Sequence, residues 1–126
     1  MKILLVDDER GFLDVMGDIL RENSHDVIVA ENGKQARESL EFEQIDLIIS
    51  DVFMPTLDGL RFHDYVREFT TVQDIPFIFM SGYDDEHTQG LVVDPSIDFF
   101  LSKTAPIENL LDLVETLKTT KESKTE

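Results

Sequence analysis

The fold of this chain is decided near its start, by the stretch Ile3-Leu4-Leu5-Val6-Asp7-Asp8-Glu9. A short, unbroken apolar run of this kind is typical of a strand that helices cover on both faces. Further runs of the same character lie at residues 27–30, 45–49, 77–80 and 97–101. Because longer stretches of helical period separate them, the sequence predicts an α/β fold with a doubly wound, five-stranded parallel sheet.

The helices are predicted from apolar residues that recur every three or four positions. The stripes for the first, third and last helices are Phe12, Val15, Met16, Ile19 and Leu20; Phe62, Tyr65, Val66 and Phe69; and Ile107, Leu110, Leu111, Val114 and Leu117. A second helix over 33–42 has only Ala36, Leu40 and Phe42 to bury. Residues 84–93 contain a glycine and run into Asp94-Pro95, which predicts a short or irregular fourth helix.

Composition limits the classes of protein to which the chain can belong. Its 126 residues fit one domain, expected over residues 1–118, with 119–126 as a polar tail or the start of a linker. The net charge of −16 disfavours direct contact with nucleic acid or an anionic membrane. Without cysteine, disulfides and thiolate metal sites are excluded. The first apolar run is too short for a signal peptide or a membrane span, so a cytoplasmic protein is expected.

Polar side chains follow the predicted strands at the point where each strand ends. They are Asp7, Asp8, Asp51, Ser81 and Lys103. Open parallel sheets bind their ligands at the carboxyl ends of the strands, so these side chains are expected to share one pocket. Three acids, a hydroxyl and an ammonium suit Mg²⁺ and a phosphoryl group, because carboxylates hold the ion while the other two groups contact phosphate oxygens.

Four blocks of sequence carry a resemblance to a known family. They are ILLVDDE at 3–9, DVFMPTLDG at 51–59, MSG at 80–82 and FLSK at 100–103. Together they resemble the receiver domain of two-component response regulators, over essentially residues 1–117. The resemblance implies a flavodoxin-like (βα)5 fold with strand order 2-1-3-4-5, an order that the general rule for doubly wound sheets gives for a chemotaxis member of this family.

The resemblance also implies a reaction. Asp51 would take a phosphoryl group from a phosphohistidine on a sensor histidine kinase or a histidine phosphotransfer protein. Asp7, Asp8 and Asp51, with the backbone carbonyl of Phe53, would hold Mg²⁺. The ion is needed because clustered carboxylates repel one another and the incoming phosphoryl group.

Ser81 and Lys103 would contact the phosphoryl oxygens, and Phe100 would move inward when Ser81 rotates. The protein would then be a regulatory phosphoacceptor rather than an enzyme with a substrate of its own. It would act on a downstream protein partner as a monomer or weak dimer. Two departures from the family pattern stand out: Thr104 replaces the usual proline after the lysine, and Asp94-Pro95-Ser96 precedes the last strand.

Other classes of protein fit the residues less well. A dehalogenase-type phosphatase has its nucleophile in an Asp-x-Asp at the end of the first strand. Here the first predicted strand ends in Asp7-Asp8, and Asp51-Val52-Phe53 lacks the second acid. An FMN binder needs donors around the flavin phosphate, which the acids at 7–9 would repel. An interaction module of receiver fold that is not phosphorylated, and a receiver that is part of a hybrid kinase or effector, stay open. The three histidines share no ligand spacing and are expected at the surface.

Overall fold

The computed structural model describes residues 1–52, 59–68, 74–82 and 94–124. Five parallel strands form one sheet in the order β2-β1-β3-β4-β5. Their bounds are β1 Lys2–Val6, β2 Asp26–Ala30, β3 Leu47–Asp51, β4 Phe77–Ser81 and β5 Asp98–Ser102. The predicted fold class and strand order are therefore confirmed.

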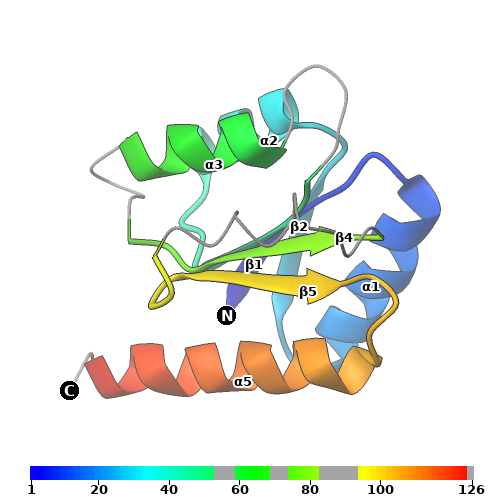
Figure 1. Ribbon diagram of the computed structural model, residues 1–126, viewed down its shortest axis with the longest axis vertical. Coiled ribbons are helices and arrows are strands. Elements are labelled where there is room, and N and C mark those ends of the chain that lie inside the picture. The colour runs from blue at the N-terminus through cyan, green and yellow to red at the C-terminus, as the bar shows by residue number, and fades with distance from the viewer. Residues whose placement is uncertain (53–58, 69–73, 83–93, 125–126) are drawn as a thin grey trace.

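Helices cover both faces of this sheet. They are α1 Arg10–Glu22, α2 Gly33–Phe42, α3 Gly59–Glu68 and α5 Ile107–Lys124. Figure 1 shows α2 and α3 on one face and α1 and α5 on the other, which is the three-layer arrangement that right-handed crossovers produce. The helix predicted over 84–93 lies outside the described residues.

Successive residues of a strand pack into two separate cores, one on each face of the sheet. In β1, Ile3 and Leu5 pack with the helices α1 and α5, whereas Leu4 and Val6 pack with α2 and α3. All four side chains are buried. This division explains the apolar runs of the sequence, since a strand that is covered on both faces buries nearly all of its side chains.

Two apolar side chains that were expected in the core are exposed. Val15 is 62% exposed, because α1 buries Leu13 and Met16 instead. Phe42 is 83% exposed and is the last residue of α2. Both predictions were wrong, because apolar spacing along a helix does not by itself fix which side of the helix the rest of the fold covers.

The last helix extends further than its apolar stripe. It was expected to fray after Leu117, but α5 continues to Lys124. An ion pair between Lys121 and Asp46, the residue before β3, ties this extension to the body of the protein. The hydroxyl of Thr120 donates to the carbonyl of Thr116 within the helix. The division of the chain at residue 118 stays a prediction.

Two of the three histidines are buried, so their predicted surface location was wrong; His87 lies outside the described residues. His25 is 4% exposed and its Nδ1 lies 3.3 Å from the amino group of Met1. His63 is 6% exposed and its Nε2 lies 2.8 Å from Oδ1 of Asp98. Each ring has a polar partner supplied by a distant part of the chain, which compensates for the loss of water.

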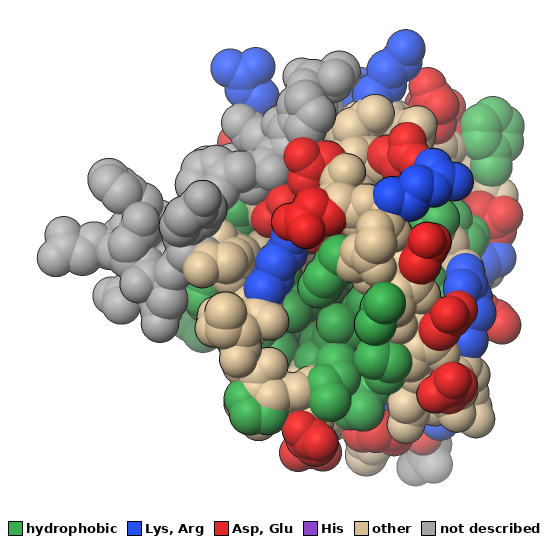
Figure 2. All heavy atoms as spheres, turned by 90° about the vertical axis from the view of Figure 1, so that its right-hand side faces the viewer, with side chains coloured by type: hydrophobic (Ala, Val, Ile, Leu, Met, Phe, Trp, Pro, Cys, Tyr) green, Lys and Arg blue, Asp and Glu red, His purple; other side chains and the backbone are tan. Residues whose placement is uncertain are grey.

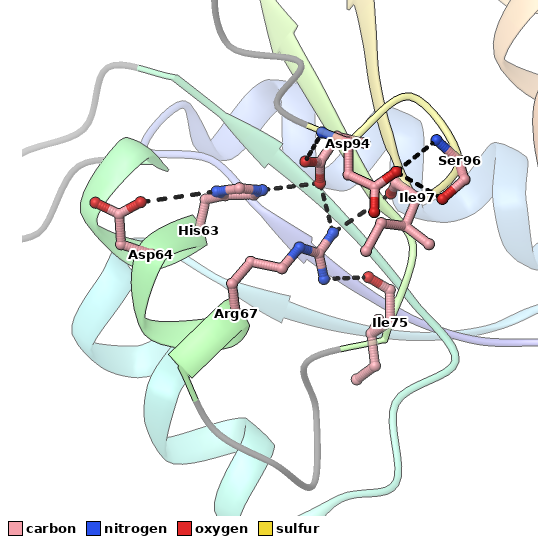
Figure 3. A network of polar contacts seen from close by, with 8 residues as sticks. His63, Asp64, Arg67, Ile75, Asp94, Ser96 and Ile97 are labelled. Atoms are coloured by element: carbon pink, nitrogen blue, oxygen red, sulfur yellow. Dashed lines mark hydrogen bonds and ion pairs between the residues drawn. The ribbon is translucent and has the colours of Figure 1, made fainter.

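The segment before β5, where the chain departs from the family pattern, forms a tight turn. The Asp94 carboxylate accepts hydrogen bonds from the backbone N–H of Ser96 at 3.0 Å and from its hydroxyl at 2.6 Å (Figure 3). These two bonds hold the pKa of Asp94 below its usual value. Asp94 thus caps the turn that leads into β5.

Candidate functional site

The carboxyl ends of β1 and β3 bring the acids together. Val6 pairs with Ser50 in the parallel register, so the residues that follow, Asp7 and Asp51, lie side by side. Asp8 joins them, and one carboxylate oxygen from each of the three residues lies within 4.8 Å of the others. Figure 2 looks onto this edge of the sheet, with acidic side chains gathered around one basic side chain and an apolar patch beside them. The predicted juxtaposition of the three aspartates is therefore present.

Asp7 is the most deeply placed of these acids. Its side chain is fully buried, with Oδ1 accepting from the backbone N–H of Glu9 at 2.8 Å. Its Oδ2 lies 2.6 Å from Nζ of Lys103. Burial raises the pKa of Asp7, and the contacts with Lys103 and the Glu9 amide limit the rise.

Asp51 is the last residue of β3, and its side chain is 10% exposed. One carboxylate oxygen accepts from the backbone N–H of Val52 at 2.9 Å, and the other lies 3.6 Å from Nζ of Lys103. Burial, followed by the negative charge of Asp7, raises the pKa of Asp51 to about 6. The Asp51 carboxylate therefore ionises near neutral pH, unlike an ordinary aspartate.

Gly59 shapes the backbone behind Asp51. Its N–H donates to the carbonyl of Val52 at 2.9 Å, which brings the first residue of α3 back against the end of β3. A Cβ at position 59 would lie 2.1 Å from the carbonyl oxygen of Asp51, so only glycine fits. The segment between them, with the Phe53 carbonyl that was expected to bind metal, lies outside the described residues.

Lys103 is the cation of this pocket. Its ammonium contacts Asp7 and Asp51, lies 3.5 Å from a carboxylate oxygen of Glu9, and sits 4.6 Å from the centre of the Phe12 ring. Burial acts to lower the pKa of Lys103, but the hydrogen bond and charge of Asp7 and the charge of Asp51 raise it overall. Sequence reasoning gave Glu9 and Phe12 no role here; the only signal was their place in the first turns after β1.

Ser81 lies at the end of β4, beside the strand that carries Lys103. It is 1% exposed, pairs with Ser102 in the sheet register, and accepts through its carbonyl from the N–H of Lys103 at 2.8 Å. The structure thus places four of the five predicted strand-end residues in direct contact or within a few ångströms, and ties the fifth, Ser81, to them through the backbone.

The donor set fits a hard divalent cation. One oxygen from each of three carboxylates lies within 4.8 Å of the others. Burial and, after it, the charge of Asp7 raise the pKa of Asp51 although Lys103 lies nearby, so the cluster can accept further positive charge. Carboxylate oxygens are the ligands that Mg²⁺ prefers in proteins. Asp8 is exposed, so an ion could reach the cluster from solvent.

The raised pKa of Asp51 predicts how stability depends on pH when no metal is present. The folded carboxyl titrates at about 6 and the unfolded one near its model value of 3.8, so the folded state holds more protons between these values. The free energy of unfolding should then fall as pH rises from about 4 to about 6, by up to about 3 kcal/mol from this group. Urea denaturation with a chelator present measures this slope.

Asp51→Asn provides the comparison, because the amide does not titrate. We expect the parent to lose more stability than this variant between about pH 4 and pH 6. Asp7 interacts with Asp51 and titrates differently in the variant, whereas acids outside the pocket titrate equally in both proteins and cancel in the difference. Parallel pH profiles for the two proteins would contradict the assigned pKa.

Several solved structures are similar to this one. The signal receiver domain of a signal transduction histidine kinase from Syntrophus aciditrophicus matches with a TM-score of 0.85 and 27% identity, covering 94% of this chain and 90% of that one. The response regulator TrrA of Thermotoga maritima, solved in complex with Mg²⁺-BeF, matches with a TM-score of 0.81 and 26% identity, over 92% and 97% of the two chains.

Curated relatives point the same way. The chain is 31% identical over 102 residues to the alkaline phosphatase synthesis transcriptional regulatory protein PhoP of Bacillus subtilis, covering 81% of this chain and 42% of PhoP. It is 31% identical over 117 residues to the response regulator MprA of Mycobacterium leprae, over 93% and 50% of the two chains. The chain therefore spans about half the length of these relatives or less.

A shorter relative covers nearly the whole chain. The uncharacterized 14.6 kDa protein in the sodA1 3' region of Leptolyngbya boryana is 32% identical over 115 residues, which is 91% of this chain and 88% of that protein. Among the described residues no helix is both long and apolar enough to cross a lipid bilayer. The model of the response regulator receiver domain family matches residues 3–115, and the chain belongs to this family as the receiver domain of a two-component response regulator.

Proposed function

We propose that Asp51 accepts a phosphoryl group from a phosphohistidine in a Mg²⁺-dependent reaction, and that this switches a protein-interaction surface. The observation that carries the proposal is the position of Asp51. One of its carboxylate oxygens lies within 4.8 Å of an oxygen from each of Asp7 and Asp8, and its Oδ2 lies 3.6 Å from the Lys103 ammonium. Asp7 is held by Glu9 and Lys103 deeper in the pocket, and Asp8 is exposed at its edge.

The proposed transfer is a substitution at phosphorus. A carboxylate oxygen of Asp51 attacks, a P–O bond forms, and the P–N bond to the donor imidazole breaks. The donor ring carries a proton on its other nitrogen, so when it takes the electron pair of the P–N bond it leaves as neutral imidazole. The product is an acyl phosphate on Asp51. Lys103 can offer a positive charge to the added oxygens, because its Nζ already lies within reach of both Asp7 and Asp51.

Asp7, Asp8 and Asp51, with the Phe53 carbonyl, would hold the Mg²⁺. When bound, the ion offsets the negative charge of the carboxylates and of the phosphoryl group. TrrA, which is 26% identical to this chain, was solved in complex with Mg²⁺-BeF, and this similarity supports the proposal. The Ser81 hydroxyl would bind a phosphoryl oxygen. This role is proposed because Ser81 is buried and pairs with Ser102 of β5, the residue before Lys103.

The surface beside the pocket has the character that a donor protein would need. A groove of about 220 Å³ runs between α1 and the start of α5 and reaches Lys103; among its lining residues are Phe12, Met16, Leu101, Ile107 and Leu110. The apolar patch next to the acidic group in Figure 2 marks this side of the molecule. A sensor histidine kinase or histidine phosphotransfer protein is the proposed donor, and a further protein the proposed target.

Other parts of the proposal concern cellular context. A cytoplasmic location, a monomer or weak dimer, and action as a regulatory phosphoacceptor rather than an enzyme are proposed from the receiver family. The net charge of −16 disfavours a direct contact with nucleic acid. Some relatives are twice as long as this chain or longer. The same function as one part of a larger regulator therefore stays open.

A small phosphodonor tests the central step. Incubation with such a donor and Mg²⁺ should add the mass of one phosphoryl group, as measured by intact-mass spectrometry. No mass gain with several donors would favour an interaction module that is not phosphorylated.

Mg²⁺ should stabilise the protein through the aspartate cluster. Because the clustered charges repel one another in the metal-free state, Mg²⁺ is expected to raise the melting temperature as it saturates the site. Asp8→Ala should remove most of this rise, and should leave the metal-free protein as stable as the parent or more stable. Differential scanning fluorimetry against Mg²⁺ concentration measures both effects.

Asp14→Ala is the matched control, since Asp14 is an exposed acid of α1 that takes no part in the cluster. It makes the same change in net charge and should keep the full response to Mg²⁺. A full response in the Asp8 variant as well would place the metal elsewhere.

A further inference from the structure

The turn that carries Lys103 is built without the proline that the family resemblance leads one to expect. Thr104 follows the lysine, and the described residues contain no cis peptide bond. The N–H of Ala105 donates to the carbonyl of Ser102 at 3.1 Å, which closes a four-residue turn with Lys103 at its second position. Because position 104 is not proline, other groups must restrict the backbone conformation of this turn.

Two hydroxyl groups on either side of the lysine supply that restriction. The Ser102 hydroxyl accepts from the backbone N–H of Thr104 at 3.2 Å, and the Ser102 and Thr104 hydroxyls lie 2.8 Å apart. Serine and threonine side chains often stabilise turns in this way, by bonding to a backbone N–H two residues along. The two hydroxyls thus bridge the residue whose side chain enters the acidic pocket.

The position of the Lys103 ammonium depends on the direction in which the side chain leaves the backbone. Its side chain is long and flexible, yet it is 14% exposed and delivers its ammonium to within 2.6 Å of Asp7 and 3.6 Å of Asp51. Holding such a side chain in one geometry costs conformational entropy, which a fixed backbone reduces. The backbone on the other side is already fixed, since the N–H of Lys103 donates to the carbonyl of Ser81.

We propose that the hydroxyls of Ser102 and Thr104 form a latch that positions Lys103 in the phosphoacceptor pocket, taking the place of a proline. Ser102 is a positioning residue, because its hydroxyl contacts the turn and none of the acids. Its effect on phosphoryl transfer rests on the proposed function, whereas its effect on the placement of the lysine does not.

Amine labelling of the metal-free protein tests the latch directly. Each lysine is modified by a small acylating reagent, and peptide mass spectrometry follows the rate at each position. Lys103 should react slowly in the parent because its ammonium is enclosed by carboxylates, and Ser102→Ala should raise its rate about 2- to 10-fold, the factor that one lost hydrogen bond allows. The exposed Lys34 should react equally in both proteins and serves as the internal reference.

Matched variants separate positioning from a general loss of structure. Ser102→Thr keeps the hydroxyl and should keep Lys103 protected, whereas Thr104→Val loses only the hydroxyl contact and should give an intermediate rate. Ser96→Ala removes a similar hydroxyl, bonded to Asp94 before β5, and should leave Lys103 unchanged. The idea is refuted if Ser102→Ala labels Lys103 at the parent rate, or if Lys34 accelerates equally.

Phosphorylation by a small phosphodonor completes the test. The rate should fall about 2- to 10-fold in Ser102→Ala and recover in Ser102→Thr. If the parent itself takes no phosphoryl group, the proposed function fails while the labelling result still decides the latch. Faster labelling of Lys103 with an unaltered phosphorylation rate would overturn the claim that the latch serves transfer.

Discussion

Asp51→Asn is expected to abolish the gain of one phosphoryl group from a small phosphodonor with Mg²⁺. Asparagine has nearly the shape of aspartate and can still accept from the N–H of Val52, as Oδ1 of Asp51 does at 2.9 Å. Its amide, however, has no anionic oxygen that can attack phosphorus. The variant should therefore fold normally and lose the reaction completely, which intact-mass spectrometry will show.

Asp64→Asn is the control for this experiment. Asp64 lies on α3 with its side chain 76% exposed, so the same chemical change is made away from the pocket. This control should be phosphorylated as fast as the parent. Chelation of the metal should stop the reaction in both proteins, because nothing then offsets the charge of the two reactants. Undiminished phosphorylation of Asp51→Asn would refute Asp51 as the acceptor.

The sequence predicted the fold well because both faces of this sheet are covered. Covered strands leave unbroken apolar runs, and β1 shows this most clearly, with Ile3 and Leu4 directed to opposite cores. The grouping of Asp7 with Asp51 follows from the same feature, since residues that end neighbouring parallel strands must meet. Which residues meet at the ends of neighbouring strands is therefore easier to predict from the sequence than which residues of a helix are buried.

The partners of buried polar groups were beyond the reach of the sequence. His63 looked like a surface residue on a helix, yet its imidazole lies against Asp98, which is 35 positions further along the chain. Nothing in local spacing indicates a partner so far away. The same holds for Lys121, whose partner Asp46 anchors the end of α5. Such pairings depend on which elements the fold places side by side.

Asp98 is the centre of a buried polar network that includes His63 and Arg67. It is the first residue of β5 and is 2% exposed. Its Oδ1 lies 2.8 Å from Nε2 of His63 and 2.5 Å from Nη2 of Arg67, and its Oδ2 accepts from the N–H of Asp94 at 3.1 Å. The network joins α3, whose first residue Gly59 lies against the backbone of Asp51, to β5, the strand that leads to Lys103.

Asp98→Ala is expected to lower the free energy of unfolding by about 3 kcal/mol. The substitution leaves the Arg67 guanidinium, whose side chain is 18% exposed, and the buried His63 ring without their shared carboxylate. Removing one partner of a buried ion pair costs more than the pair contributes, because the remaining charge stays desolvated. Urea denaturation at neutral pH measures the loss.

Asp26→Ala is the matched control, since Asp26 is also the first residue of a strand but is exposed. It should change the free energy of unfolding by less than about 0.5 kcal/mol. Equal losses in the two variants would mean that the network contributes no more than an exposed acid does.

The pH dependence of this difference has a definite sign. Burial acts to raise the pKa of Asp98, but the hydrogen bonds from Arg67 and His63 outweigh it, and the pKa is lowered overall. A carboxyl whose pKa is lower in the folded state stabilises fully above its unfolded pKa, and that stabilisation is lost as pH falls through the folded value. The gap between parent and Asp98→Ala should therefore be widest near neutral pH and should shrink once pH falls below about 4. A gap that widened in acid would show that the carboxylate is not held in its charged form by Arg67 and His63.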